Sequence, residues 1–524
     1  MSHFKSVSSL CISASMIFSP LLSSAQTPAA PAKTFERPPQ FIMFAFDGSK
    51  SVPMWKETRE YAKSMTAAKK PVKFTYFINT SYLIHHNNRK MTVPEWNNQP
   101  IYQAPQLPVG TSAIGYACSG SVDKGCGLED ITQRADQMSR AFLEKHEIAS
   151  HAVGHFDANG GMAGGTKYTK WSYEDWISEH NQFFNLLFNG LAVQNIPTLN
   201  FAPSGMAFKR SNLVGFRAPQ LGIGNGFNDA LKANSFKYDT SRVAADVYWP
   251  EKLAASKAWN FPLAVIPVYR PDGPRLQTLG KTLAMDYNFC VFQTQKASGK
   301  VTGNCDTYPA LTTQFRDEMY ASYMQYFLKL YTGNRAPIQI GHHFSKWNNG
   351  AYWDAMKQFA DSVCGLPDVK CVIYEDYLKW IDKLSPEALK FYRTFKGSWG
   401  QKPKDLAAVK IERDYIPSVK LALIKDDIAS ITAAGLRQQG YRTQIELNGQ
   451  LLSNDRISVR SLEKQVARGE TEVVVTAKLV NAKGQVVNQS MHLVKDLGLS
   501  TIRLDSQSID QKHLTGDLEG AHKE

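Results

Sequence analysis

The segment from Lys145 to His155 reads KHEIASHAVGH, a short apolar run followed by two histidines, His151 and His155. If the chain turns helically after a strand here, residues four apart share one face, about 5–6 Å apart at Cβ, and can bind one divalent cation. Histidines at this spacing also arise by chance in a chain that has twelve of them. The pair therefore indicates a metal site only together with residues elsewhere in the chain.

Length and composition are those of a globular protein with a sizeable core. The chain has 524 residues, of which 43% are hydrophobic and 20% charged. This length predicts two or three folding units. No internal apolar run approaches the roughly 20 residues that span a bilayer, so we expect no transmembrane segment.

The first 25 residues are typical of a secretory signal peptide. A weakly cationic start with His3 and Lys5 precedes an apolar, serine-rich stretch, and small residues precede a cleavage point near Ala25. Cys11 lies inside the apolar stretch, so a lipid anchor is not indicated. We expect a protein secreted to the periplasm or the extracellular space.

Cysteine usage agrees with export. The six cysteines outside the signal peptide form three sequence-local couples, Cys118/Cys126, Cys290/Cys305 and Cys364/Cys371. Six cysteines allow fifteen pairings, and local closure of three loops is the simplest in an oxidising compartment. A zinc cluster is disfavoured because no CxxC occurs and the couples are far apart.

The net charge of +13 would suit an anionic partner such as a cell-wall polymer, nucleic acid or an acidic membrane surface. No arginine-rich run or basic helix with interleaved aromatic residues occurs, and secretion argues against nucleic acid. A solvated basic surface is the simplest interpretation.

Strand and helix patterns alternate after a Pro/Ala-rich linker at residues 26–38. Gln40 to Phe46 is an apolar run that predicts a buried strand, Ser51 to Lys69 has helical spacing, and Val72 to Asn79 predicts a second strand. Further predicted elements are a helix at Ile131 to Leu143 and strands at Glu147 to Ser150, Phe216 to Pro219, Lys237 to Asp239, Ala264 to Val268, Ile338 to His343 and Val372 to Tyr374. Repeated β-α units imply a parallel sheet or barrel over residues 39–388, with chemistry at the carboxyl ends of its strands.

The period of the pattern changes after a connector at residues 389–417. Apolar and polar residues then alternate with period two, and Asn481 to Gly484 reads as a hairpin turn. This predicts a small all-β, sandwich-like C-terminal domain over residues 418–510, followed by a flexible tail at 511–524.

Four further features lie at predicted strand ends or in turns: Asp47-Gly48, Arg217-Ala218-Pro219, Trp249-Pro250 and His342-His343. Taken singly, each has an ordinary explanation. They could be a turn, a surface ion pair, a core aromatic residue and a satisfied polar residue.

Taken together, the segments resemble one family. They are, in chain order, AFDG at 45–48, HEIASHAVGH at 146–155, GFRAP at 215–219, KYDTS at 237–241 with Trp249-Pro250, and NRAPIQIGHH at 334–343 followed by LPDVKCVIYEDYLKWI. This order and spacing is similar to the polysaccharide deacetylase family (NodB homology, carbohydrate esterase 4), most of all its chitin-deacetylase-like branch. The resemblance covers about Pro39 to Ile381. It implies a distorted (β/α) barrel of about seven strands and metal-dependent removal of an N-acetyl group from a β-1,4-linked amino sugar.

The resemblance also implies residue roles. His151 and His155 match the two metal-binding histidines, Asp47 matches the general base, and Arg217 matches the arginine that holds the base. His343 best matches the late histidine that acts as general acid. His342 is its rival, since alternation along a strand sends only one of the two toward the site.

Two substrate contacts follow from the same resemblance. Trp249 resembles an aromatic residue near the acetyl pocket. The backbone N–H of Gln220, directly after Pro219, is the position of an oxyanion donor. The glycine-rich loop at 160–165 either shapes a substrate groove or is a flexible connector.

One departure concerns the metal. The family's third ligand, an aspartate, corresponds to Gly48. Two imidazoles without a carboxylate bind zinc more weakly and leave it a stronger Lewis acid. Three outcomes are open: Asp47 moves onto the metal as third ligand, Ser49 or a water fills the gap, or the metal is lost.

We therefore expect a secreted hydrolase that uses a divalent metal, Zn²⁺ in the first place, to deacetylate peptidoglycan or a chitin-like polymer. Peptidoglycan is preferred on grounds of compartment alone. The rival hypothesis is a catalytically silent carbohydrate-binding protein on the same barrel, its metal lost through Gly48.

Overall fold

The computed structural model describes residues 35–395 except 120–124, 273–274 and 302, together with residue 399, eight strands beyond it, and residues 449, 481–482 and 484–485. The expected signal peptide and flexible tail, most of the linker and most of the connector lie outside the described residues. None of the described helices has the length and apolarity needed to cross a bilayer.

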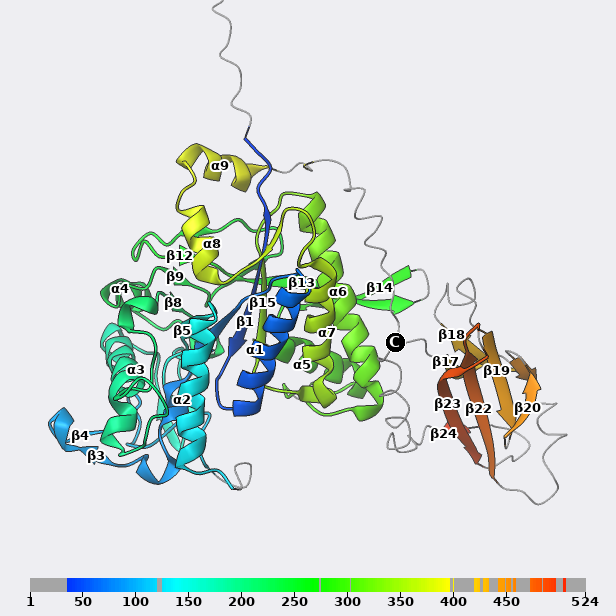
Figure 1. Ribbon diagram of the computed structural model, residues 1–524, viewed down its shortest axis with the longest axis horizontal. Helices are drawn as coiled ribbons and strands as arrows, with labels where there is room; N and C mark the ends of the chain where they lie inside the picture. The colour runs from blue at the N-terminus through cyan, green and yellow to red at the C-terminus, as the bar shows by residue number, and fades with distance from the viewer. Residues whose placement is uncertain are drawn as a thin grey trace, which may run out of the picture. The chain divides into compact units, whose positions relative to one another are not determined.

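The main sheet has nine strands and is curled into a half-barrel (Figure 1). Its order is β11-β12-β9-β8-β5-β2-β1-β15, and β16 pairs with the start of β1. The strands are β1 (Gln40–Asp47), β2 (Phe74–Ile78), β5 (Glu147–Ser150), β8 (Gly215–Phe216), β9 (Tyr238–Asp239), β11 (Glu251–Lys252), β12 (Trp259–Asn260), β15 (Ile338–His343) and β16 (Val369–Cys371). All described pairs are parallel except β11–β12. The predicted distorted α/β barrel is confirmed, and its sheet is open among the described strands.

Helices pack around this sheet (Figure 1). They are α1 (Val52–Ala67), α2 (Leu128–Leu143), α3 (Tyr173–Val193), α4 (Phe227–Ala233), α5 (Asp286–Ser298), α6 (Thr312–Thr332), α7 (Trp347–Val363), α8 (Tyr374–Ile381) and α9 (Pro386–Thr394). α8 packs on the inner face of the curled sheet, where its residues join the core cluster of β1. α3 shows why such segments are helical. Its capping box joins Ser172 and Asp175 reciprocally, and Trp176, Phe183 and Leu187 are buried along one face.

Side chains alternate between the two faces of β1, and this determines which of them lie at the carboxyl-end opening of the barrel. Phe41, Met43 and Ala45 belong to the core inside the curled sheet, whereas Phe46 packs on Trp353 of α7. Because side chains alternate between the two faces, Asp47 continues the inward row at the carboxyl end of the strand. β15 pairs in register, with Asp47 opposite His343 and Phe46 opposite His342.

One predicted unit is wrong. Ala264 to Val268 lies in β13 (Leu263–Asp272), which pairs antiparallel with β14 (Arg275–Leu283) and parallel with β10 (Val243–Ala245) in a separate sheet. Only two residues separate β13 from β14. A two-residue loop joins antiparallel strands, whereas a parallel crossover needs a dozen or more residues.

Two connecting segments contain short helices or strands: the segment between β2 and α2, which we call the excursion, and the glycine-rich loop. The excursion contains the short helices η1 (Thr80–Leu83), η2 (His86–Asn88) and η3 (Pro94–Trp96) and the strands β3 (Thr92–Val93) and β4 (Gln99–Pro100). Residues 161–168 form a hairpin of β6 (Gly161–Ala163) and β7 (Thr166–Tyr168). Its turn residues Gly164 and Gly165 have positive φ, which glycine adopts freely.

All three predicted disulfides are confirmed: Cys118–Cys126, Cys290–Cys305 and Cys364–Cys371. Disulfides are typical of proteins that fold in an oxidising compartment.

The C-terminal strands form two antiparallel sheets, as the period-two pattern predicts. One contains β17 (Val419–Ile424), β18 (Asp427–Thr432) and β21 (Arg456–Ser458); the other has the order β20 (Gln450–Ser453), β19 (Arg442–Leu447), β22 (Glu472–Val480), β23 (Val486–Lys495) and β24 (Arg503–Asp505). Ile445, Val475 and Leu479 are buried within them. β22 and β23 form the hairpin expected at residues 481–484.

Candidate active site at the carboxyl ends of the strands

A buried ion pair lies at the centre of the site. Arg217, just beyond β8, donates from Nη1 to Asp47 Oδ1 at 2.6 Å, and both side chains are almost fully buried. Arg217 also donates to Thr240 Oγ1 at 2.7 Å and to the Tyr374 hydroxyl at 3.3 Å, and its guanidinium lies over the Phe77 ring. Burial alone raises the pKa of Asp47, but Arg217, with smaller contributions from His151 and His343, outweighs burial, and the pKa lies below its ordinary value. Asp47 is therefore a carboxylate at neutral pH.

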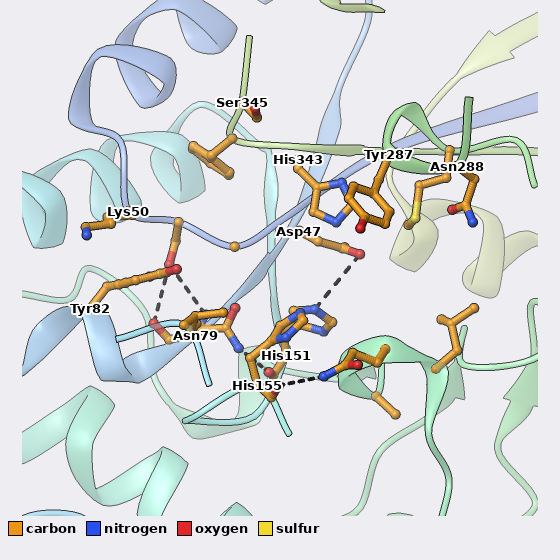
Figure 2. A pocket seen from close by; sticks show the side chains of 18 of the residues that line it. Asp47, Lys50, Asn79, Tyr82, His151, His155, Tyr287, Asn288, His343 and Ser345 are labelled. Atoms are coloured by element: carbon orange, nitrogen blue, oxygen red, sulfur yellow. Dashed lines mark hydrogen bonds and ion pairs between the residues drawn. The ribbon is translucent and has the colours of Figure 1, made fainter. Parts of the chain in front are cut away.

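His151 and His155 meet beside this carboxylate (Figure 2). Their ring centroids are 4.9 Å apart, and His151 Nε2 is 4.0 Å from Asp47 Oδ2. The helical turn expected between them is wrong. Ala152 and His155 have φ values of 58° and 61°, so left-handed residues, not a helix, bring the rings together.

The protonation of His151 follows from its hydrogen bond. Its Nδ1 is 2.7 Å from the backbone oxygen of Arg217, which can only accept, so Nδ1 carries the proton and Nε2 keeps its lone pair. Burial lowers the pKa of His151, and burial followed by the neighbouring His151 lowers the pKa of His155 to about 3. Both imidazoles are thus neutral, as metal ligands must be.

A buried carboxylate holds the loop between the two histidines. Glu179 of α3 accepts from the backbone N–H groups of Val153 at 2.8 Å and Gly154 at 3.3 Å, and from the Tyr102 hydroxyl at 3.0 Å. Burial raises the pKa of Glu179 to about 7. Asn79, at the end of β2, donates to the backbone oxygen of His151.

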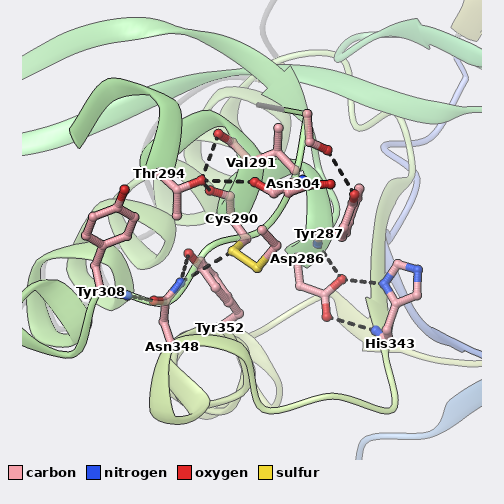
Figure 3. Close-up of a disulfide and its surroundings, with 12 residues drawn as sticks. Asp286, Tyr287, Cys290, Val291, Thr294, Asn304, Tyr308, His343, Asn348 and Tyr352 are labelled. Carbon is pink, nitrogen blue, oxygen red and sulfur yellow. Dashed lines mark hydrogen bonds and ion pairs between the residues drawn. A yellow bond between two sulfur atoms is a disulfide. The ribbon is translucent and has the colours of Figure 1, made fainter. Parts of the chain in front are cut away.

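His343, not His342, faces the site. Its Nδ1 is 2.7 Å from Asp286 Oδ1, and its backbone N–H donates to Asp286 Oδ2 at 2.8 Å (Figure 3). Burial alone lowers the pKa of His343, but the charge and hydrogen bond of Asp286, with a smaller contribution from Asp47, outweigh it and the pKa is raised. Burial lowers the pKa of His342 to about 4, and its ring packs on Phe46.

Asp286 is held by α5 and a disulfide. The aspartate lies in the first turn of α5, where a carboxylate interacts favourably with the helix dipole. One turn later, the Cys290–Cys305 bond ties α5 to the following loop, and the Tyr287 hydroxyl donates to Gly303 of that loop at 3.1 Å (Figure 3). Burial alone raises the pKa of Asp286, but the charge and hydrogen bonds of His343 together with the charge of His342 outweigh it, and the pKa lies below its ordinary value.

These groups line a cavity of about 640 Å³ (Figure 2). Asp47, His151, His155 and His343 are joined by the aromatic side chains of Tyr82, Tyr287 and Trp347 and by Lys50, Asn79 and Gln220. A polar cluster next to aromatic walls is the usual make-up of a ligand-binding cavity.

Two residues expected at the site have different surroundings. Trp249 is buried against Trp380 and Tyr392, donates to the backbone oxygen of Asn334 at 3.1 Å and does not line the cavity. Pro219 is also outside the lining, whereas Gln220 belongs to it and has a φ of 52°. The glycine-rich hairpin contributes no residue to the cavity.

The sequence interpretation missed Asp286, Glu179, Tyr287 and Trp347. Asp286 could have been noticed as an acidic residue in the first turn of a helix, but nothing in the sequence connects it with a histidine 57 residues away. Glu179 sits in an amphipathic helix and resembles any other helical glutamate there.

The chemistry of the donor set suits a divalent metal, although the ligand atoms of Asp47, His151 and His155 do not all lie within 4.8 Å of one another. Asp47 Oδ2, His151 and His155 offer one oxygen and two imidazoles, and an imidazole Nδ1–H bonded to a backbone carbonyl is typical of metal-binding histidines. Gly48 has a φ of 89°, and no atom lies within 4 Å of the position that a Cβ would take. Cys118, Cys126 and Asp130 also cluster, but the two sulfurs are joined to each other and offer no thiolate.

No family model matches the chain, and no curated protein sequence gives a significant match. Among solved structures, one provisionally assigned as a polysaccharide deacetylase of Mycobacterium smegmatis is 16% identical, with a TM-score of 0.35 over 69% of this chain and 96% of that one. A peptidoglycan deacetylase of Bacillus subtilis, solved as a mutant, is 10% identical, with a TM-score of 0.29 over 66% of this chain and 92% of that one. A mutant CE4-family pseudoenzyme with restored activity is 8% identical, with a TM-score of 0.30 over 65% and 68% of the two chains. Likenesses this low carry no argument about the family or the activity of this chain.

Replacing Glu179 by alanine is expected to weaken zinc binding. The N–H groups of Val153 and Gly154 would lose their buried acceptor, at a cost of about 1–3 kcal/mol for each unpaired group, and the histidine loop would loosen. Loss of such outer contacts typically costs about 10–100-fold in metal affinity. Competition titration with a zinc chelator, alongside urea unfolding, measures both effects.

Glu179→Gln keeps an acceptor oxygen for the two N–H groups and should recover most of the affinity. Glu174→Ala, on the exposed side of the same helix, is the matched control. A folded Glu179→Ala protein that binds zinc as tightly as the wild type would contradict this role.

Proposed function

We propose that this chain is a secreted, metal-dependent deacetylase that removes acetyl groups from N-acetylated amino sugars of a cell-wall polysaccharide. The observation that carries the proposal is the juxtaposition of an ionised Asp47, two neutral imidazoles and a protonatable His343 around one cavity. Amide hydrolysis needs an activated water, stabilisation of the carbonyl oxygen and a proton for the leaving amine. These groups could meet all three needs.

Asp47 supplies the base in this proposal. Arg217 occupies Oδ1 and keeps the carboxylate ionised, which leaves Oδ2 for taking a proton from water or for binding the metal. A zinc ion held by His151, His155 and Asp47 would polarise the acetyl carbonyl and lower the pKa of a bound water. The backbone N–H of Gln220 is the proposed donor to the developing oxyanion.

His343 supplies the acid. Its Nδ1 is held by Asp286, so the other ring nitrogen is free to carry a proton toward the leaving nitrogen. The raised pKa keeps that proton on the ring near neutral pH. Asp286 acts through His343 as a positioning residue, since it holds both the ring and the backbone N–H.

The substrate is proposed to be peptidoglycan or a chitin-type polymer. Tyr82, Tyr287 and Trp347 line the cavity and offer apolar faces on which sugar rings can stack. Peptidoglycan is preferred because the signal-like N-terminus and the three disulfides indicate export. On this proposal residues 39–388 are the catalytic unit and residues 418–510 a separate β domain.

The rival function is a silent carbohydrate-binding protein, and Gly48 is the observation that favours it. No side chain there completes the ligand set, so the metal could have been lost while the cavity was kept.

Metal content and acetate release separate the two functions. We expect about one zinc per chain and acetate released from peptidoglycan or chitin oligomers by the wild type, with both lost in His151→Ala because Nε2 is removed. A wild-type protein without bound metal, and with no acetate above the His151→Ala background, would contradict the enzyme and support the silent binder.

Introducing a carboxylate at residue 48 tests the ligand gap. Gly48→Asp places an oxygen donor in open space beside Asp47 and is expected to raise zinc affinity about tenfold or more, at a cost of about 1–2 kcal/mol for the left-handed backbone. Gly48→Asn, of equal size without the charge, is the control. Equal zinc affinities for the aspartate and asparagine variants would show that residue 48 does not reach the metal.

The pH dependence of turnover reports on His343. The acid must be protonated, so kcat should fall as pH rises through the raised pKa, that is, above the ordinary histidine value of about 6.5. Asp286→Asn removes the negative charge that raises this pKa and should move the alkaline limb to lower pH. An alkaline limb at the same pH in both proteins would exclude His343 as the acid.

A further inference from the structure

A second cavity, of about 550 Å³, lies away from the candidate active site. Its walls are the excursion after β2, from η3 through β4 to residue 106, and one face of α3 (Figure 1). No residue of this groove lines the active-site cavity. We refer to it as the amide groove.

Uncharged amides dominate the lining. Seven of the fourteen lining residues are asparagine or glutamine, whereas Glu95 is the only one with a charge. A primary amide offers two donors and an acceptor, which matches ligands that both donate and accept, such as hydroxyl and acetamido groups. The near absence of charge gives the groove no means of recognising an anion or a cation.

The walls of the amide groove are tied together. Gln182 of α3 accepts from the backbone N–H of Gln103 and donates to its carbonyl oxygen, both at 2.9 Å. Gln106 donates to Asp175 at 2.7 Å and accepts from the backbone N–H of Thr169 at 2.9 Å. The groove is therefore preformed, which reduces the entropic cost of binding.

Other polar groups in the groove are left for a ligand. Within the described part of the chain, no hydrogen bond is made by the side chains of Asn97, Gln99 and Asn181 or by the indole N–H of Trp96. Trp96 is half-buried at the end of η3, and Asn97 after it has a φ of 55°. The indole thus provides an apolar ring with a polar edge at the groove wall.

The excursion connects the amide groove with the active site. It leaves β2 directly after Asn79, which lines the active-site cavity. Ile101 and Gln103 line the groove, whereas Tyr102 between them donates to Glu179, which holds the histidine loop. Tyr102 thus links the segment that lines the groove to the residue that holds the histidine loop.

We propose that the amide groove is a second binding site, which takes an uncharged oligosaccharide. The ring of Trp96 would stack on one sugar, and Asn97, Gln99 and Asn181 would bond to hydroxyl or acetamido groups. This site goes beyond the proposed deacetylase function, since it would bind a glycan whether or not the chain is an enzyme.

The test is calorimetric titration of the full chain with a hexamer of N-acetylglucosamine in the presence of EDTA, so that no turnover occurs. Trp96→Ala should weaken binding about tenfold, the equivalent of 1.4 kcal/mol, whereas Trp96→Phe keeps an aromatic ring and should stay within a factor of about three. Asn181→Ala, on the exposed face of α3, should weaken binding without affecting folding.

Equal hexamer affinity in the wild type, Trp96→Ala and Asn181→Ala would overturn the inference, and so would affinity lost only on replacing Tyr287 in the active-site cavity.

A failure of the proposed function can be distinguished from a failure of this inference. A chain that releases no acetate but binds the hexamer through Trp96 would contradict the deacetylase and support the groove. A chain that releases acetate but binds the hexamer equally well with and without Trp96 would support the deacetylase and contradict the groove.

Discussion

The site depends on one buried ion pair, Arg217 with Asp47. Removing two charges from water is costly, and breaking such a pair by deleting one partner costs about 3–5 kcal/mol. The guanidinium also donates hydrogen bonds to Thr240 and Tyr374, and its face lies over the ring of Phe77. The same arginine fixes His151 through its backbone oxygen, so one residue sets both the charge of the carboxylate and the tautomer of the imidazole.

The surroundings shift the pKa values of three histidines around one cavity in opposite directions. His151 and His155 are neutral because burial outweighs the attraction of Asp47. His343 lies opposite Asp47 on the paired strand, and Asp286 adds a second negative charge and two contacts. Identical side chains thus have lowered pKa values at one wall and a raised pKa at the other, which suits the lone-pair donors and the proton donor of the proposed function.

Much of this arrangement could be predicted because strands impose their alternation on the sequence. The inward row of β1 ends at Asp47, and the pairing of β15 sends His343 rather than His342 to the same mouth. Residues whose role depends on distant partners could not be found this way. Asp286 and Glu179 act on groups many residues away.

The prediction that Trp249 lies at the site rested on too common a pattern. An aromatic residue next to a proline also occurs in protein cores, and here Trp249 packs on Tyr392. The β13–β14 hairpin was missed because a buried apolar run does not reveal its direction.

The clamp of Glu179 on Val153 and Gly154 has a consequence for metal exchange. Two successive N–H groups converge on one side-chain oxygen of Glu179, which satisfies them within the protein. The loop that presents His151 and His155 is therefore ordered by an internal hydrogen-bond acceptor. On the proposed function, a metal would bind to a loop that is already ordered, so its binding free energy would not be spent on ordering the chain.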